Sequence, residues 1–238
     1  MDGTFLTAEW RDLLMLNYSV DPNLLMKYVP IGTELDECDG KTFLSLVGFQ
    51  FLKTRVFGIS FPFHSNFEEV NLRFYVRCCQ NGEVRRGVVF IGEMVPRRAI
   101  AMIANAFYNE NYVALPMGHR ISPENSATRC VEYSWKLASG EARMTAVISG
   151  AARVPENGSE QQFIAEHYWG YAAQGDSGTM EYRVGHPAWK VWSTEWADFE
   201  GDLTGLYGAE LAEVVHGRPS SAFVAEGSEV TVHRGRRL

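Results

Sequence analysis

The segment Phe67–Met94 most constrains the fold of this chain, because it places charged side chains on a strand face that is otherwise apolar. Polar and apolar residues alternate strictly from Glu69 to Val76, which is the period of a β-strand. The dipeptide Asn81-Gly82 follows, and Asn-Gly strongly favours a two-residue hairpin turn because both turn positions adopt positive φ. The segment therefore predicts a β-hairpin.

The predicted turn decides which side chains share a sheet face, since directly paired residues point to the same side. The expected pairs are Tyr75 with Val88, Arg73 with Phe90, Asn71 with Gly92, and Glu69 with Met94. The opposite face is apolar as well and carries Val70, Leu72, Phe74, Val76, Val89 and Ile91. A sheet covered on both sides, with an acid, an amide and a guanidinium on one of them, predicts a barrel wall that lines a pocket.

A second interpretation of the same residues stays open. Arg73 and Glu69 would then lie at a wet barrel mouth or form a structural ion pair. The register is inferred from the turn alone, and a slip of one residue would invert the two faces of the strand.

The rest of the chain is rich in predicted strands, with short helices between them. Strands or β-rich stretches are expected at 13–20, 42–52, 127–137, 141–149, 180–184, 189–196 and 220–232, and helices at 22–29, 96–109 and 159–166. The expected fold class is mainly β (α+β), an antiparallel arrangement with two or three helices. We expect a single domain over 1–238, with a weak possible break near 155–160.

Charge and hydropathy exclude several classes of partner. The net charge is −7 with no basic stripe, so nucleic-acid binding is not expected. No apolar run reaches the roughly 18–20 residues that cross a bilayer, and the start lacks a signal-peptide pattern. A cytoplasmic protein with four reduced cysteines is expected. The aromatics around 189–196 would suit a subunit interface, so a homo-oligomer is a possible assembly.

Short motifs elsewhere give no catalytic or metal site. Gly175-Asp176-Ser177-Gly178 matches the nucleophile sequence of trypsin-like proteases, but no preceding histidine has the flanking residues of a base, so ordinary turn chemistry is favoured. The six histidines never fall at metal-ligand spacing, and no phosphate loop or dinucleotide fingerprint occurs. No metal and no cofactor is therefore expected. The cluster from His186 to Trp189 is interpreted as a turn capped by a packed tryptophan.

Several motifs resemble those of a known superfamily. The segments similar to acetoacetate decarboxylases are Tyr18-x-x-Asp21-x-x-x-Leu25-x-x-x-Val29-Pro30, Phe67-x-Glu69-Val70 and Tyr112-x-x-Leu115-Pro116. More closely, Glu69-x-Asn71-Leu72-Arg73-x-Tyr75-Val76 with Arg86-Gly87-Val88 is similar to the YqjF-like proteins, domain of unknown function 2071, of the same superfamily. The resemblance implies a cone-like β-barrel of the acetoacetate decarboxylase-like type with a buried small-molecule pocket, usually in an oligomer.

The residues that would carry decarboxylation are replaced. Decarboxylases of this fold use a Schiff-base lysine whose pKa is lowered by a neighbouring lysine. The resemblance places that pair at Met117 and Gly118, and it places an expected arginine at Ser19. No lysine lies between Lys53 and Lys136, so Schiff-base decarboxylation is not expected. Of the active-site residues that the resemblance implies, only Glu69 is present in this sequence.

Two functional hypotheses follow. In the first the protein is an enzyme without a lysine imine, in which Glu69 is a general acid or base, Arg73 holds a carboxylate or enolate, and His119 assists. Its ligand would be a small organic acid or carbonyl compound such as a keto acid, a lactone or an aromatic acid. The remaining ligand-binding residues would be Asn71, Phe90, Met94 and Met117. In the second hypothesis the protein is a non-catalytic ligand-binding or structural β-barrel, with Arg73 and Glu69 as a buried pair.

Overall fold

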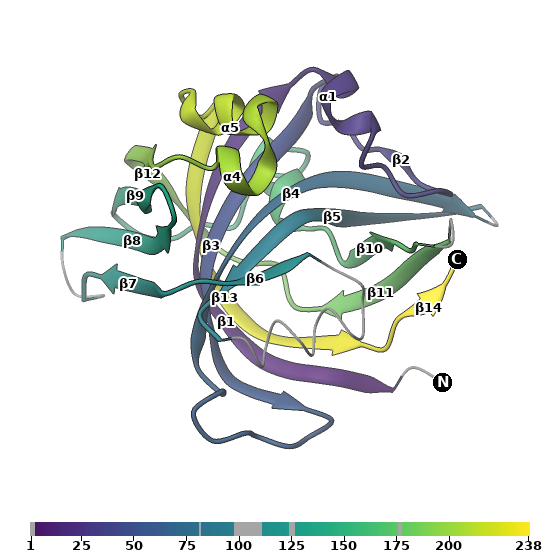
Figure 1. Cartoon of the computed structure of the whole chain (residues 1–238), viewed down its shortest axis with the longest axis horizontal. Helices are drawn as coiled ribbons and strands as arrows, with labels where there is room; N and C mark the ends of the chain where they lie inside the picture. Colours follow the sequence, from purple (N-terminus) through teal and green to yellow (C-terminus); the bar gives the residue numbers. More distant parts are fainter. Residues whose placement is uncertain (1–2, 81, 98–110, 124–126, 176–177) are drawn as a thin grey trace.

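The computed structural model describes residues 3–80, 82–97, 111–123, 127–175 and 178–238. Seven strands pair in a closed ring, which Figure 1 shows as a large curved sheet. In ring order they are β11 (Thr179–Gly185), β10 (Trp169–Ala173), β5 (Glu83–Val95), β4 (Phe67–Gln80), β3 (Thr42–Val56), β1 (Thr4–Val20) and β13 (Ser221–His233). β13 returns to β11 through the pairs Val184–Val232 and Gly185–Thr231. Only β10 and β5 pair in parallel within this ring of described strands, so the mainly β, largely antiparallel class is confirmed.

A second sheet continues from the ring and covers part of its outside. It runs from β12 (Val191–Glu200), which pairs with β13, through β9 (Gly140–Ser149) and β8 (Thr128–Leu137) to β7 (Met117–Ile121). Figure 1 shows this group of strands to one side of the ring. The short strands β2 (Glu34–Leu35), β6 (Tyr112–Ala114) and β14 (Arg236–Arg237) add to β4, β5 and β11.

The described residues contain four helices, more than the two or three expected. The helices predicted at 22–29 and 159–166 are confirmed as α1 (Pro22–Met26) and α3 (Glu160–Ala165). Asp21 and Ser159 cap them by accepting hydrogen bonds from backbone N–H groups two and three residues on. The sequence did not predict α4 (Thr204–Tyr207) or α5 (Ala209–His216), which begin without a side-chain cap. Most of the helix predicted at 96–109 lies outside the described residues.

Two cores lie on opposite faces of the ring strands. The inner core is inside the ring and is formed by buried residues that include Leu13, Met15, Val47, Tyr75 and Val88. The outer core lies between the ring, the second sheet and α5, and it includes Leu72, Phe74, Tyr133, Trp135 and Leu211. Successive residues of β4 alternate between the two cores because side chains of a strand point to opposite faces.

The segment expected to be a weak break, 155–160, leads directly into α3. Phe163 and Ile164 of that helix are buried in the inner core, so α3 fills one part of the ring interior. Among the described residues, the helices are all too short or too polar to span a membrane.

Candidate functional site

A cavity of about 240 Å³ lies inside the ring, and every one of the seven ring strands contributes side chains to its lining. This volume is close to the lower end of the roughly 300–1,000 Å³ that is usual for small-molecule sites. Phe61 and His64, from the loop between β3 and β4, also line it, and Phe61 is 46% exposed, so the cavity reaches the surface there. The lining is mostly aromatic and aliphatic, with a few polar groups among them.

Strand β4 places three of the predicted site residues in this cavity. Glu69, Asn71 and Arg73 are spaced two residues apart, so all three point to the inner side of the ring. They are only 3%, 1% and 9% exposed. Phe90, which pairs with Arg73 from β5, also lines the cavity. The sequence therefore identified four side chains that the fold brings together.

The prediction for Met94 is wrong, because an irregularity in the β4–β5 pairing shifts the register. The predicted pairs Tyr75–Val88 and Arg73–Phe90 are confirmed, but Leu72 then pairs with Gly92, which leaves Ile91 as an extra residue on β5. A bulge of this kind reverses the faces of all residues beyond it. Met94 accordingly packs in the outer core beside Val70 and Leu72.

Glu93 takes the place in the cavity that Met94 was expected to have. It pairs with Asn71 across the strands and is 2% exposed. No pattern in the sequence indicated this residue, because the turn at Asn81-Gly82 alone predicts an unbroken register. The cavity thus contains two buried glutamates, Glu69 and Glu93.

Met117 and His119 also lie outside the cavity lining, contrary to the prediction. Both are on β7, where Met117 packs against the outer core. His119 Nδ1 lies 2.7 Å from Glu68 Oε1, and this contact raises the pKa of His119. Glu68 precedes Glu69 and points to the opposite face of β4, so His119 is not placed to assist Glu69.

Glu69 is held by two hydrogen bonds within the site. Its Oε1 accepts one from Asn71 Nδ2 at 3.0 Å, and its Oε2 accepts one from the Tyr112 hydroxyl at 3.3 Å. Tyr112 belongs to β6, which pairs with the end of β5. These contacts fix the orientation of the carboxylate in the cavity.

Arg73 does not form the ion pair with Glu69 that was one of the two interpretations. Its Nη2 donates to the Met15 sulfur at 3.8 Å, and its guanidinium lies 5.8 Å from the centre of the Tyr75 ring. Its Nε has no hydrogen-bond partner among the described residues. A sulfur and a ring face are weak partners for a buried cation, so among the described residues the guanidinium has no strong acceptor.

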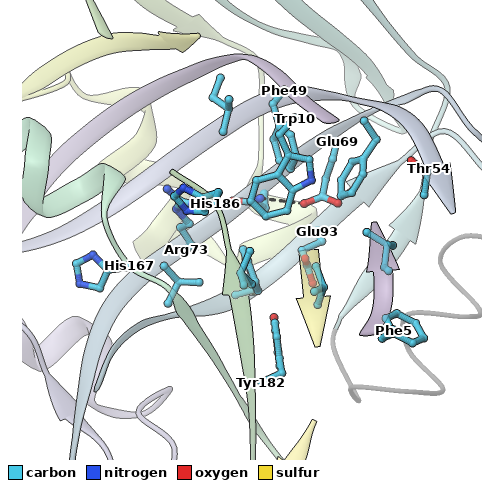
Figure 2. A pocket seen from close by; sticks show the side chains of 18 of the residues that line it. Phe5, Trp10, Phe49, Thr54, Glu69, Arg73, Glu93, His167, Tyr182 and His186 are labelled. Carbon is cyan, nitrogen blue, oxygen red and sulfur yellow. Dashed lines mark hydrogen bonds between the residues drawn. The ribbon is translucent and has the colours of Figure 1, made fainter. Parts of the chain in front are cut away.

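Two histidines that the sequence did not identify as site residues also line the cavity, His167 and His186. His167 follows α3, and its Nε2 lies 3.3 Å from Oδ2 of the buried Asp36. His186 stacks on Trp189 with 3.9 Å between ring centres, and its Nδ1 donates to the Pro187 carbonyl at 2.8 Å. Figure 2 shows both histidines toward the same side of the view as Arg73.

Burial favours the neutral form of both histidines. Burial lowers the pKa of His186 to about 4, and the positive charge of Arg73 acts in the same direction. Burial and the charge of Arg73 also lower the pKa of His167, although Asp36 opposes them. Because a carbonyl can only accept, Nδ1 of His186 carries the proton and Nε2 is the acceptor nitrogen.

Several buried polar atoms of the lining lack a hydrogen-bond partner among the described residues. Besides Arg73 Nε they include Trp10 Nε1, Thr54 Oγ1 and Asn71 Oδ1. Buried polar atoms in folded proteins nearly always have a partner. Their concentration around one cavity indicates a space for the polar atoms of a ligand or of ordered water.

Other candidate chemistry gains no support. No group of three or more His, Cys, Asp or Glu side chains among the described residues could hold a metal ion. Asp176 and Ser177 of the protease-like motif lie outside the described residues.

Comparison with known proteins places this geometry in a family. A family model described as "Uncharacterized conserved protein (COG2071)", DUF2071, matches residues 7–229. No curated protein matches the sequence.

Solved structures with a similar fold include acetoacetate decarboxylases and the enzyme MppR. The acetoacetate decarboxylase of Legionella pneumophila superposes with a TM-score of 0.67 at 12% identity, over 98% of this chain and 87% of that one. An acetoacetate decarboxylase-like enzyme from Sphingomonas wittichii RW1 gives 0.64 at 16% identity, over 100% and 94%. The enduracididine biosynthesis enzyme MppR, complexed with pyruvate, gives 0.66 at 12% identity, over 98% and 90%. At these identities the similarity shows the fold.

Proposed function

We propose, from the premise that this chain belongs to the DUF2071 family of acetoacetate decarboxylase-like fold, that its cavity binds a small organic acid or carbonyl compound through Arg73. The observation that carries the proposal is the buried guanidinium, which has no strong acceptor among the described residues and lies at the wall of a mostly apolar cavity. A planar guanidinium pairs well with a carboxylate, and the pair is strengthened where water is excluded. The similar MppR enzyme is complexed with pyruvate, which is a keto acid of this class.

The proposed chemistry does not use a lysine imine. The lysines of the chain are Lys27, Lys41, Lys53, Lys136 and Lys190, and none of them lines the cavity. The resemblance places the lysine pair at Met117 and Gly118, and Met117 packs outside the ring. A decarboxylase mechanism through a Schiff base is therefore not part of the proposal.

If the ligand is transformed, Glu69 is the residue that acts as general acid or base. Its carboxylate is oriented by Asn71 and Tyr112 and lies on the same strand and face as Arg73. A carboxylate held near a bound carbonyl compound could move a proton on the adjacent carbon. The alternative is a protein that binds the same ligand and does not change it.

The experiment is a thermal-shift and calorimetric titration with pyruvate, acetoacetate, benzoate and γ-butyrolactone. It compares the wild type with Arg73→Met, which removes the charge but keeps much of the side-chain volume. Arg55→Met is the matched control, because Arg55 lies on β3 next to the cavity residue Thr54 but is exposed to solvent. A ligand that prefers the native state raises the melting temperature.

We expect at least one carboxylate to stabilise the wild type and Arg55→Met, and not Arg73→Met. Equal shifts in all three proteins, or no shift in the wild type, would contradict the proposal. Any stabilising compound is then followed by proton NMR in the presence of wild type and Glu69→Gln. Conversion by the wild type alone supports the enzyme, and unchanged compound in both supports the binding protein.

A further inference from the structure

Aromatic rings form a continuous part of the cavity wall. Phe51 and Phe67 stack with 4.7 Å between centres, and Trp10 meets Phe49 and Phe51 edge-on at 5.2 and 5.6 Å. Trp10 also lies 6.2 Å from Trp189, the ring on which His186 stacks. Trp10 therefore connects the two groups of rings. Such a wall favours a planar ring system in the ligand, because rings pair edge-on or in offset stacks.

Two hydrogen-bond donors of the cavity lining lack a partner among the described residues. The indole Nε1 of Trp10 is buried, and an indole N–H can only donate. Arg73 Nε is the second donor, and it is cationic. A water or a ligand oxygen has to satisfy each of them, and a ligand that leaves one unsatisfied binds less tightly.

Arg73 and Trp10 come from different ring strands, β4 and β1, and approach the cavity from different directions (Figure 2). The two donors select different groups, because the guanidinium favours an anion and the indole N–H donates to any oxygen acceptor. The ring wall lies around Trp10, which places the planar part of a ligand next to the indole.

We infer that the ligand is an aromatic carboxylate with a second oxygen on its ring, in which Arg73 binds the carboxylate and Trp10 selects the second oxygen. This inference rests on the proposed function and adds the ligand class and a specificity-determining residue. It distinguishes aromatic acids from the aliphatic keto acids and lactones that the proposed function also allows.

The test is isothermal titration calorimetry with four matched acids: cyclohexanecarboxylate, benzoate, 3-hydroxybenzoate and 4-hydroxybenzoate. Cyclohexanecarboxylate keeps the carboxylate and the six-membered ring but is not planar. The two hydroxybenzoates add an oxygen at different distances from the carboxylate. The proteins are the wild type, Trp10→Phe, which keeps a ring but removes the N–H donor, and Arg73→Met.

In the wild type we expect benzoate to bind about 2- to 10-fold more tightly than cyclohexanecarboxylate, the range for an aromatic pair. One hydroxybenzoate should gain a further factor of about 2 to 10 for one hydrogen bond. In Trp10→Phe that second gain should disappear while benzoate still binds. In Arg73→Met all four acids should bind weakly or not at all.

The failures can be told apart. Aliphatic and aromatic acids that bind the wild type equally, or hydroxybenzoates without any gain, overturn the ligand class and leave the carboxylate site intact. A gain that persists in Trp10→Phe overturns the role of Trp10. If none of the four acids binds the wild type, the inference fails, and the titrations with pyruvate, acetoacetate and γ-butyrolactone decide the proposed function separately. The wild-type comparison stands even if Trp10→Phe is poorly folded, which circular dichroism would reveal.

Discussion

The two faces of β4 are buried in different ways, since one face packs in a core and the other lines a cavity. Val70, Leu72 and Phe74 point outward and are completely buried against the second sheet. Glu69, Asn71 and Arg73 point inward, are nearly as buried, and line a cavity. The side chains on the two faces are thus almost equally buried, but those on the outer face contact other apolar side chains and those on the inner face border a cavity.

The difference teaches that burial alone does not identify a core residue. On the outer face, apolar side chains fill the space around one another, which is how proteins gain stability from packing. On the inner face, polar atoms such as Asn71 Oδ1 and Arg73 Nε are buried beside a cavity without a partner among the described residues. Unsatisfied buried polar groups lower stability, so their presence on this face supports the proposed binding function.

The largest effect should come from the outer face. Phe74→Ala removes a ring that is 0% exposed, and we expect it to lower the free energy of unfolding by about 3–5 kcal/mol. Phe90→Ala on the cavity side is the matched control and should lower it by clearly less, because Phe90 is only partly buried and already borders a cavity. Urea denaturation of both variants measures the difference. Equal losses would remove the distinction between the faces.

The next effect depends on pH and belongs to the inner side. The pKa of His186 is lowered from 6.5 to about 4 by burial and by Arg73, so the unfolded chain binds a proton at higher pH than the native protein does. Stability should therefore fall as the pH drops from about 6.5 to about 4, by at most about 3 kcal/mol from this residue. His167 contributes in the same direction.

The variant His186→Phe isolates this contribution, since a phenyl ring can still stack on Trp189 but does not titrate. We expect the stability of the variant to fall less steeply than that of the wild type between pH 6.5 and 4. Denaturation midpoints at half-unit pH intervals provide the comparison. Parallel profiles would show that His186 is protonated equally in both states.

A smaller effect should come from overfilling the outer core. A Cβ at Gly48 of β3 would lie 2.8 Å from Met144 Sδ and 2.8 Å from Tyr133 Cδ2. Gly48→Ala should lower stability by about 1–3 kcal/mol, the usual result of overpacking. Gly118→Ala on β7 is the control, because its nearest atom, Ser134 Oγ, is 4.0 Å away, and it should change stability little. Similar losses at both sites would mean that the outer core is not tightly packed.

The smallest effect should have the opposite sign. Arg73→Met removes a buried charge without a strong acceptor, so we expect stability to stay constant or to rise by up to about 1 kcal/mol. Arg85→Met is the contrast, because Arg85 donates to the buried Glu181 at 2.7 Å. It should lower stability by about 3 kcal/mol, the low end for a broken buried pair, since Arg236 still contacts Glu181.

Thermal and urea denaturation without ligand measure both arginine variants. A loss for Arg73→Met comparable to that for Arg85→Met would identify Arg73 as a structural residue. The binding assays above would then have no site to report.

The sequence by itself determined the local part of this protein. The alternation from Glu69 to Val76 and the Asn81-Gly82 signal correctly predicted the β4–β5 hairpin and its first pairs, Tyr75–Val88 and Arg73–Phe90. They also placed Glu69, Asn71 and Arg73 on one face, because a period of two residues is a property of the strand alone. Framework motifs further along the chain pointed to the fold family that the comparisons show.

Only the tertiary structure decided what surrounds those side chains. Because Ile91 is an extra residue on β5, Glu93 instead of Met94 points into the cavity. Next to this bulge, the Tyr207 hydroxyl of α4 donates to the Gly92 carbonyl at 3.3 Å. A Cβ at Gly92 would lie 2.8 Å from the Tyr207 ring. His167 and His186 reach the cavity from far along the chain, whereas His119 and Met117 end on its outside. A bulge and a cavity wall depend on contacts between segments that are distant in the sequence, and the two-residue period of one strand does not predict such contacts.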